Sequence, residues 1–492
     1  MQTELIKNLL LFGPEVTIVA FLVALFILDA TFPKSRGSYL GFAIVLMASL
    51  CGIWITCQLG SQPETPFFSG MVIHDGFGRF FRYLFFVTVA AASWVAFQSK
   101  EVDSKSRTEF ALLILCVLFG MNLMAISTHL LMLYLAIETV SIVSFAMAGF
   151  KREDLRSNEA ALKYLVFGAF SSGIMLYGIS LIYGLTGSMQ YTEIATYLAA
   201  NSAQTSVPLT VALLMIFSGF AYKISAFPFH FWTPDVYEGA PTPVVAFFSV
   251  APKAAGFAAL IRFIFEVLSV HGTAGNWQLL HPPTLTILSG LAVATMVVGN
   301  FSALWQTNVK RIMAYSSIAH VGYMLMGLVT FSYTGLSAIL FYLVVYAAMN
   351  LGAFWVISLV ADCRGGEDLK DFGGTGWTMP VAGACMAVFL FSLTGLPFFS
   401  GFIGKFLLFG ALVQTPGLLW LALIGVLNSV VSLYYYMQIL RSMYFDSSDN
   451  PVQVVATRAQ IVGIVLLAIP TILFGLYFTP VIQFVERSLT GF

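Results

Sequence analysis

Charged residues are scarce in this chain of 492 residues. Asp, Glu, Lys and Arg together make up 9% of it, whereas a soluble domain carries roughly 25%. Hydrophobic residues account for 59%, and the mean hydropathy is +0.89, which excludes a soluble globular protein. The formal net charge is zero, so no basic excess indicates a nucleic-acid partner.

Cysteine is rare as well. The five cysteines form no CxxC pair, and four of them lie within apolar stretches. Iron–sulfur clusters and structural zinc sites need several thiolates at short spacing, so we interpret these cysteines as small apolar packing residues. The start of the chain has neither a strongly basic region nor a small-residue cleavage site. We expect its apolar stretch to be retained as a helix.

Apolar stretches of spanning length, by contrast, are abundant. A transmembrane helix needs about 20 largely apolar residues, because its backbone must satisfy its hydrogen bonds internally where water is absent. We predict an all-α integral membrane protein with about fourteen transmembrane helices. Their approximate ranges are 14–33, 39–59, 79–98, 109–128, 130–150, 160–185, 207–229, 243–269, 284–304, 310–331, 335–361, 379–413, 417–443 and 458–485.

The basic residues in the loops and at the adjoining helix ends lie mostly on one predicted side of the membrane. The loops after odd-numbered helices, with the adjoining helix ends, carry Lys34, Arg36, Lys100, Lys105, Arg107, Lys151, Arg152, Arg156, Lys310, Arg311, Arg364, Lys370, Arg441 and Arg458. The opposite side carries only Lys7, Arg79, Arg82 and Arg487. Because short cytoplasmic loops retain Lys and Arg, both termini are predicted to face away from the cytoplasm.

Five basic residues remain inside the predicted helices: Lys163, Lys223, Lys253, Arg262 and Lys405. Placing Lys or Arg at a helix centre costs about 2.5–3.5 kcal/mol on insertion scales, so a residue kept there usually has a function. A lysine deprived of water also releases its proton more readily. We therefore take the lysines as candidates for proton transfer.

Glu138 is the only acidic residue that we place in the middle of the membrane, in the fifth helix. If it faces Lys223, movement of a neighbouring charge changes the proton affinity of that lysine by a few kcal/mol at an effective dielectric constant of about 20. Such a pair would be the electrostatic switch of a proton pump. The alternative is a static ion pair that holds two helices together.

Three other ionisable side chains have both a structural and a functional interpretation. Lys163 follows Glu159 by four residues, which is the favourable order for an ion pair on one helix face, and it is equally suited to a relay. His320 is either a packed, hydrogen-bonded residue or a relay group, since imidazole titrates near neutral pH. Arg262, with Glu266 four residues later, is interpreted as structural.

Two predicted helices contain a proline near a buried lysine. Pro228 lies in FSGFAYKISAFPFHFW and Pro397 in FLFSLTGLPFFSGFIGKF. Proline removes a backbone donor and blocks the carbonyl four residues earlier, so we predict breaks in helices seven and twelve, beside Lys223 and Lys405. Freed carbonyls are tolerated in a membrane only inside protein or beside water. A kink that merely improves packing is the alternative.

The two proline segments also indicate an internal repeat. They are five helices apart, and an odd offset inserts the second copy upside down, as in many transporters. We therefore predict two inverted five-helix repeats. The expected divisions are 1–105 for three peripheral helices, 106–275 for the first repeat, 276–445 for the inverted second repeat and 446–492 for the last helix.

The stretch KISAFPFHFWTPDVYEGAPTPVVAFFSVAPK resembles the antiporter-like subunits of proton-pumping NADH:quinone oxidoreductase, respiratory complex I. Other similar stretches are ETVSIVSFAMAGF, NEAALKYLVFGAF, NVKRIMAYSSIAHVGYML and GLPFFSGFIGKF, so the resemblance covers about helices four to thirteen. Helix twelve carries Lys405 instead of the Glu typical of subunit M, and no long lateral helix follows as in subunit L. Both departures favour the subunit N branch.

The resemblance implies roles for individual residues. Glu138 and Lys223 match the family's ion pair between helices five and seven. Lys253 matches its central lysine, and Lys405 matches the terminal lysine on the broken twelfth helix. Lys163 resembles the helix-six lysine of this branch.

The family also implies partners and a location. It predicts no redox cofactor on this chain, because NADH, flavin, iron–sulfur clusters and quinone are expected on partner subunits. The expected partners are the other membrane-arm subunits of complex I, including neighbouring antiporter-like subunits, and lipids. The expected location is the bacterial inner membrane, where the chain would move protons coupled to quinone reduction elsewhere in the complex.

Three alternatives remain open. A subunit of a multisubunit sodium/proton antiporter would share the same lysines and differ in its partners. A substrate transporter with inverted repeats would present Ser, Thr or Asn at the helix breaks, whereas Phe-rich segments dominate here. A structural scaffold would not depend on Lys223 or Lys253, so their replacement by Met would leave pumping intact.

Overall fold

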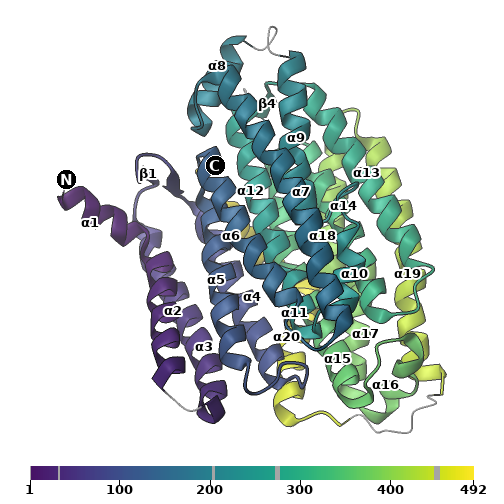
Figure 1. Cartoon of the computed structure of the whole chain (residues 1–492). Helices are drawn as coiled ribbons and strands as arrows, with labels where there is room; N and C mark the ends of the chain where they lie inside the picture. Colours follow the sequence, from purple (N-terminus) through teal and green to yellow (C-terminus); the bar gives the residue numbers. More distant parts are fainter. Residues whose placement is uncertain (1, 32–33, 202–205, 272–276, 448–454) are drawn as a thin grey trace.

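Long helices standing side by side form one bundle in the computed structural model of this chain (Figure 1). The structure describes residues 2–31, 34–201, 206–271, 277–447 and 455–492. Within these ranges, thirteen helices are long and apolar enough to cross a membrane. The prediction of an all-α integral membrane protein is confirmed.

The described elements are, in chain order, α1 (Gln2–Leu11), α2 (Gly13–Thr31), α3 (Lys34–Gln58), η1 (Leu59–Ser61), β1 (Thr65–Phe67), β2 (Val72–His74), α4 (Gly76–Gln98), α5 (Arg107–Ile126), α6 (Leu130–Ala148), α7 (Leu155–Thr186), α8 (Tyr191–Asn201), α9 (Ser206–Ile224), α10 (Trp232–Gly239), α11 (Thr242–Phe248), α12 (Ala251–Val267), β3 (Ser269–His271), β4 (Trp277–Leu279), α13 (Pro283–Ala303), α14 (Val309–Val329), α15 (Tyr333–Arg364), η2 (Leu369–Phe372), α16 (Thr375–Thr378), α17 (Pro380–Thr394), α18 (Ser400–Gln414), α19 (Leu419–Phe445), α20 (Arg458–Leu476) and α21 (Thr479–Ser488). β1 pairs antiparallel with β2, and β3 pairs antiparallel with β4.

The predicted twelfth helix is present as two short helices. α17 and α18 have 15 residues each, so each is about 22 Å long at a rise of 1.5 Å per residue. That is less than the hydrocarbon thickness of about 30 Å. The pair therefore has to cross the membrane together, and with the thirteen longer spans it accounts for the expected number of about fourteen.

The predicted eighth helix, 243–269, is not continuous, which corrects the sequence-based expectation. α11 ends at Phe248 and α12 begins at Ala251. Pro252 lies in the first turn of α12, where its missing N–H costs no hydrogen bond. An unbroken helix would instead place this proline against the carbonyl of Phe248, so the chain ends one helix and starts another directly before Lys253.

The predicted last helix, 458–485, is also divided, and short elements appear that were not predicted. α20 ends at Leu476, and α21 starts at Thr479 with Pro480 in its first turn. Helices α1 and α8 and the two hairpins fall outside the predicted spans. Helices α1, α8 and α21 and the hairpin strands are too short for a criterion based on spanning length to detect.

Loops emerge at two opposite faces of the bundle. The β1–β2 hairpin, the β3–β4 hairpin and the C-terminal Phe492 line one cavity, and the N-terminus lies toward the same end in Figure 1. Lys100, Lys151 and Lys310 line a different cavity. Helix α4 connects the two ends, because it starts after β2 and ends just before Lys100. We call the end that carries these three lysines the basic face.

The centre of the bundle is formed by α11, α12, α14 and α15, which are buried along almost their whole length. The outer helices α2 and α20 leave most of their residues uncovered by protein. Both groups consist largely of apolar residues. This pattern fits a membrane protein, in which lipid can replace protein around the outer helices.

The first three spans contain a buried ion pair that was not predicted. Arg82, counted from the sequence among the basic residues of the non-cytoplasmic side, is fully buried in α4 and donates to both carboxylate oxygens of Glu15 at 2.8 and 2.9 Å. Glu15, in the first turn of α2, is also fully buried. Glu15 is thus more deeply buried than Glu138, which is only partly buried. The pair joins α2 to α4 over a separation of 67 residues.

We expect the Arg82→Met substitution to destabilise the subunit by about 3–5 kcal/mol, because it leaves the carboxylate of Glu15 buried without a counter-ion. The double substitution of Glu15 and Arg82 by Met should cost clearly less, since no charge remains uncompensated. Thermal unfolding of the purified complex measures both effects. Arg79→Met, three residues earlier in α4, is the control, and a double variant as unstable as Arg82→Met would contradict the explanation.

Candidate functional site

The first helix break lies at the end of α9, beside Lys223. The helix stops one residue after this lysine, and Ser225 adopts a φ of +65°, a conformation that costs a non-glycine residue about 1–3 kcal/mol. Trp232 Nε1 donates to the carbonyl of Tyr222 at 3.1 Å. The ammonium of Lys223 is 2% exposed and donates to Ser141 Oγ at 3.1 Å.

Glu138 does not make the predicted contact with Lys223, since no ion pair within 4 Å joins the two in the described structure. Ser141, one helical turn further along α6, binds the ammonium instead. The charge of Glu138 is still close enough to act on Lys223. One carboxylate oxygen of Glu138 is buried without a described hydrogen-bond partner, and its side chain lines an open groove of about 770 Å³ between α6 and α7.

Lys253 lies in the first turn of α12, directly after the unpredicted break. Its Nζ donates to Ser317 Oγ of α14 at 2.5 Å and lies 5.4 Å from the ring centre of Tyr237. One turn later, Gly256 packs against the stem of Lys223, where an added Cβ would lie 3.4 Å from Lys223 Cγ. The helices that carry the two lysines are therefore in contact.

Lys405 lies in α18 and reaches back to the end of α17. Its Nζ donates to the carbonyls of Leu393 at 3.0 Å and Thr394 at 2.8 Å, and to Ser429 Oγ at 2.9 Å. The Leu393 carbonyl is the one that the sequence predicts to be freed. Gly395 has a φ of +90°, and a Cβ there would meet Lys405 Cδ at 2.9 Å, so only glycine suits this turn.

His320 lies in α14 between two tyrosines. Its Nδ1 is 2.6 Å from the hydroxyl of Tyr342, and its Nε2 is 3.0 Å from the hydroxyl of Tyr436. The ring is 1% exposed. The charges of Lys253 and Lys405 both act on it, which places His320 electrostatically between the two lysines.

Polar groups continue from α14 toward Lys405. The ammonium of Lys405 lies 4.8 Å from the ring centre of Tyr323, and the Tyr323 hydroxyl accepts a hydrogen bond from Asn300 Nδ2 at 3.2 Å. Asn300 Oδ1 in turn accepts from the hydroxyl of Tyr435 at 3.0 Å. Hydroxyl and amide groups of α13, α14 and α19 thus extend through the interior of the bundle.

Lys163 differs from the other three lysines, because its side chain is 38% exposed and paired with carboxylates. The predicted pair with Glu159 is confirmed at 2.7 Å, and Asp235 lies 2.6 Å away. Arg311 binds both Asp235 and Glu238, at 2.9 and 2.7 Å. Burial raises the pKa of Asp235, but its two basic partners outweigh that effect and hold the pKa below its usual value.

Arg262 is buried in a structural cluster, as predicted for the Glu266 pair. It binds Glu266 at 2.6 Å and also Asp75, which the sequence did not indicate, at 2.8 Å. Its Nε donates to the carbonyl of Ala125 at 2.9 Å. Two carboxylates compensate the charge of Arg262. Through Asp75, which lies between β2 and α4, and Ala125 of α5, this arginine connects α12 to both of those elements.

Several residues of this interior had no signal strong enough to find them. Ser141 and Ser317 each bind a buried lysine, but single serines in apolar helices are common. Tyr436 lies in a run of three tyrosines at 434–436, and the pair Ser316–Ser317 lies one turn before His320 in AYSSIAH. The tyrosine run and the Ser-Ser pair are the two sequence features that point to these residues.

Comparison with known proteins agrees with this architecture. A family profile described as NADH:quinone oxidoreductase/Mrp antiporter, transmembrane region, matches residues 127–432. NADH-quinone oxidoreductase subunit N 2 of Sorangium cellulosum is 47% identical over 99% of this chain and 98% of its own length. A chain of respiratory complex I from Thermus thermophilus with bound aureothin has a TM-score of 0.79 at 31% identity, covering 96% of this chain and 98% of that one. A chain of the Mrp complex from Dietzia sp. shares the fold, with a TM-score of 0.80 at 19% identity over 97% of each.

The fold and the buried lysines define an antiporter-like membrane subunit. The chain belongs to the NADH:quinone oxidoreductase/Mrp antiporter family, and within that family to the subunit N branch. The predicted resemblance is confirmed over nearly the whole chain, including the first three helices, for which no motif had been found.

We expect Gly401→Ala to disturb the site of Lys405. A Cβ at position 401 would lie 1.9 Å from the carbonyl oxygen of Ser392, so α18 would have to move away from the end of α17. Strain of this kind costs about 1–3 kcal/mol. Gly410→Ala in the same helix is the control, because no atom lies within 4 Å of its added Cβ. Thermal unfolding of the complex compares them, and equal stabilities would refute the close contact.

Proposed function

We propose that this chain is a proton-translocating membrane-arm subunit of an NADH:quinone oxidoreductase and that Lys223, Lys253 and Lys405 carry the protons. One observation carries the proposal. In the described structure, the three lysines donate only to hydroxyl and carbonyl groups and have no carboxylate within 4 Å.

The other deeply buried cations of the described bundle behave differently. Arg82, Arg262 and Lys310 are each paired with at least one carboxylate at 2.6–2.9 Å. A buried ion without a counter-ion carries an effective penalty of several kcal/mol, and a lysine can avoid it by losing its proton, which arginine cannot. The unpaired cations are all lysines, which favours proton exchange over a structural role.

The path follows from the contacts of these residues. Lys223 and Lys253 lie on touching helices. Ser317 and His320 on α14 lead from Lys253 toward Lys405, with tyrosine hydroxyls on both sides of the imidazole. Each transfer moves one proton from an ammonium to a neighbouring base and leaves a neutral amine. His320 serves as the intermediate group of this relay.

Glu138 and Lys163 have supporting roles in the proposed relay. Glu138 acts on Lys223 through its charge without touching it. A change of about one elementary charge near the lysine alters its proton affinity by a few kcal/mol at an effective dielectric constant of about 20. Lys163, held by two carboxylates near the basic face, supplies a proton donor at the surface end of α7.

The proposal extends to the partners and to the arrangement in the membrane. NADH oxidation and quinone reduction, with their cofactors, take place on partner subunits, and other membrane-arm subunits adjoin this chain. The basic face is cytoplasmic in a bacterial inner membrane, because short cytoplasmic loops retain Lys and Arg. Residues 106–275 and 276–445 act as two inverted half-units, each with a lysine beside a helix break. An Mrp-type antiporter subunit is the second candidate, and co-purification with NADH:quinone reductase subunits distinguishes the two.

We expect Lys253→Met and Lys405→Met to lower NADH-driven proton uptake by about tenfold or more, because each removes a group that exchanges protons. The measurement is proton uptake by membrane vesicles together with NADH oxidation by the assembled complex. Lys105→Met is the control, since Lys105 is an exposed lysine in the α4–α5 loop. Wild-type proton uptake in both substituted complexes would refute the relay.

The orientation has its own test. In a chain whose five native cysteines are replaced by serine, Glu153→Cys should react with a membrane-impermeant thiol reagent in inside-out vesicles only. Thr490→Cys, near the C-terminus, should react in right-side-out vesicles only. Both positions are exposed, so the reverse pattern would place the basic face outside the cytoplasm.

A further inference from the structure

A charged cavity of about 520 Å³ opens at the basic face. Seven acidic and four basic side chains line it, giving a formal net charge of −3. They come from five separate connections between helices: those around residues 100, 151, 238, 308 and 362–371. A concave site of one sign of charge concentrates ions of the opposite sign, so this cavity attracts cations, including hydronium.

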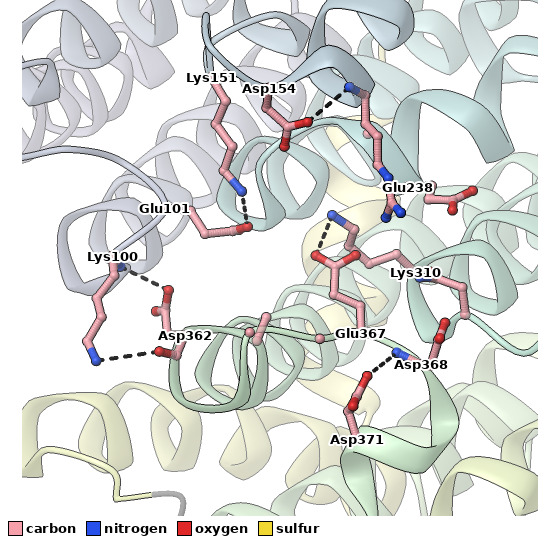
Figure 2. A pocket seen from close by; sticks show the side chains of 16 residues that line it. Lys100, Glu101, Lys151, Asp154, Glu238, Lys310, Asp362, Glu367, Asp368 and Asp371 are labelled. Carbon is pink, nitrogen blue, oxygen red and sulfur yellow. Dashed lines mark hydrogen bonds and ion pairs between the residues drawn. The ribbon is translucent and has the colours of Figure 1, made fainter. Parts of the chain in front are cut away.

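The inner wall of the cavity is built around Lys310, which was predicted to lie at the cytoplasmic end of a helix and is only 2% exposed. Its ammonium binds Glu367 at 2.7 Å and the carbonyl of Ala240 at 3.0 Å. Figure 2 shows this pair on one side of the open space, with Glu101 and Lys151 paired on the other side. Two ion pairs thus face each other across the cavity.

Thr242, the first residue of α11, connects the two carboxylates. Its backbone N–H donates to Glu101 at 2.6 Å, and its hydroxyl is 3.5 Å from a carboxylate oxygen of Glu367. Burial raises the pKa of Glu101, but Lys310 and Lys151 outweigh this and hold the pKa below its usual value. Burial raises the pKa of Glu367 above its usual value despite the adjacent Lys310. Glu367 is therefore the carboxylate of the two that more readily holds a proton.

The cavity reaches close to Lys253 through the short segment 237–240. The ring of Tyr237 lies against the Lys253 ammonium, Glu238 and Gly239 line the cavity, and the Ala240 carbonyl binds Lys310. The hydroxyl of Tyr237 is fully buried and has no hydrogen-bond partner in the described structure. Its neighbourhood includes Ser317, the serine that binds Lys253.

We propose that this cavity is the proton entrance of the subunit and that Glu367 is the carboxylate that takes up the proton destined for Lys253. Glu367 accepts a proton from hydronium, which leaves water, and becomes a neutral carboxylic acid. It then releases the proton inward, through water and the hydroxyls of Tyr237 and Ser317, to the neutral amine of Lys253. Lys310 positions Glu367, and loss of the carboxylate charge loosens this ion pair.

The inference rests on the proposed proton relay, so its test includes Lys253→Met. We expect Glu367→Gln to lower NADH-driven proton uptake by about tenfold, since a carboxamide cannot exchange the proton, and Glu367→Asp to keep most of it. Glu153→Gln should have no effect, because Glu153 is an exposed acid of the same face that does not line this cavity.

A second measurement acts on the assembled complex, so a folding defect cannot imitate it. With the native cysteines replaced by serine, Asp362→Cys is treated with an impermeant anionic thiol reagent in inside-out vesicles. Proton uptake should be present before modification and stop after it, whereas it should continue in the modified Glu153→Cys control. Asp362 suits this test because it lines the cavity away from Lys310 and leaves the Glu367 carboxylate in place.

The outcomes separate the two proposals. If the Glu367 variants and the modified Asp362→Cys complex pump like the wild type while Lys253→Met does not, the entrance lies elsewhere and the relay stands. If Lys253→Met pumps like the wild type, the relay itself is refuted and the inference falls with it. Reduced uptake in the cavity variants, together with a block in Lys253→Met and an unaffected Glu153 control, supports the inference.

Discussion

Inside a bilayer, a helix that stops leaves carbonyl groups without donors, and no water is at hand to satisfy them. In the described part of this chain, a buried lysine adjoins three helix breaks, those between α9 and α10, between α11 and α12 and between α17 and α18. At the α17–α18 break the solution is direct, because the Lys405 ammonium binds the two carbonyls that the end of α17 leaves free. The break needs a donor and the lysine needs acceptors, so each stabilises the other without a counter-ion.

The buried cations fall into two chemical groups, and the division follows from the groups that surround them. Arg82 and Arg262 form ion pairs with carboxylates at 2.8 Å. These arginines stay charged and connect separate helices. The lysines at the breaks meet only dipoles. Dipoles stabilise an ammonium less than a carboxylate does, and they remain satisfied by water or each other when the proton leaves. The buried lysines without a carboxylate partner thus lie where the backbone is interrupted.

This arrangement also relates the interior to the basic face. Tyr237, in α10, lies with its ring 5.4 Å from the Lys253 ammonium, and the carbonyl of Ala240, directly after α10, accepts a hydrogen bond from Lys310. Both α10 and α11 are short because the chain around them is interrupted by glycine and proline. A continuous helix would have separated the surface charges from the central lysine by a full wall of apolar side chains.

The sequence by itself determined the all-helical membrane class, the number of crossings and the few basic residues that lie inside the helices, because hydrophobicity and buried charge act locally along the chain. It also indicated two breaks, since the effect of proline on a helix depends only on its neighbours in sequence. The tertiary structure alone decided which cations have partners: Glu15 meets Arg82 over 67 residues, and Ser141 rather than Glu138 holds Lys223. Pairing depends on rotation of each helix about its own axis, which is set by packing against its neighbours and leaves no local mark in the sequence.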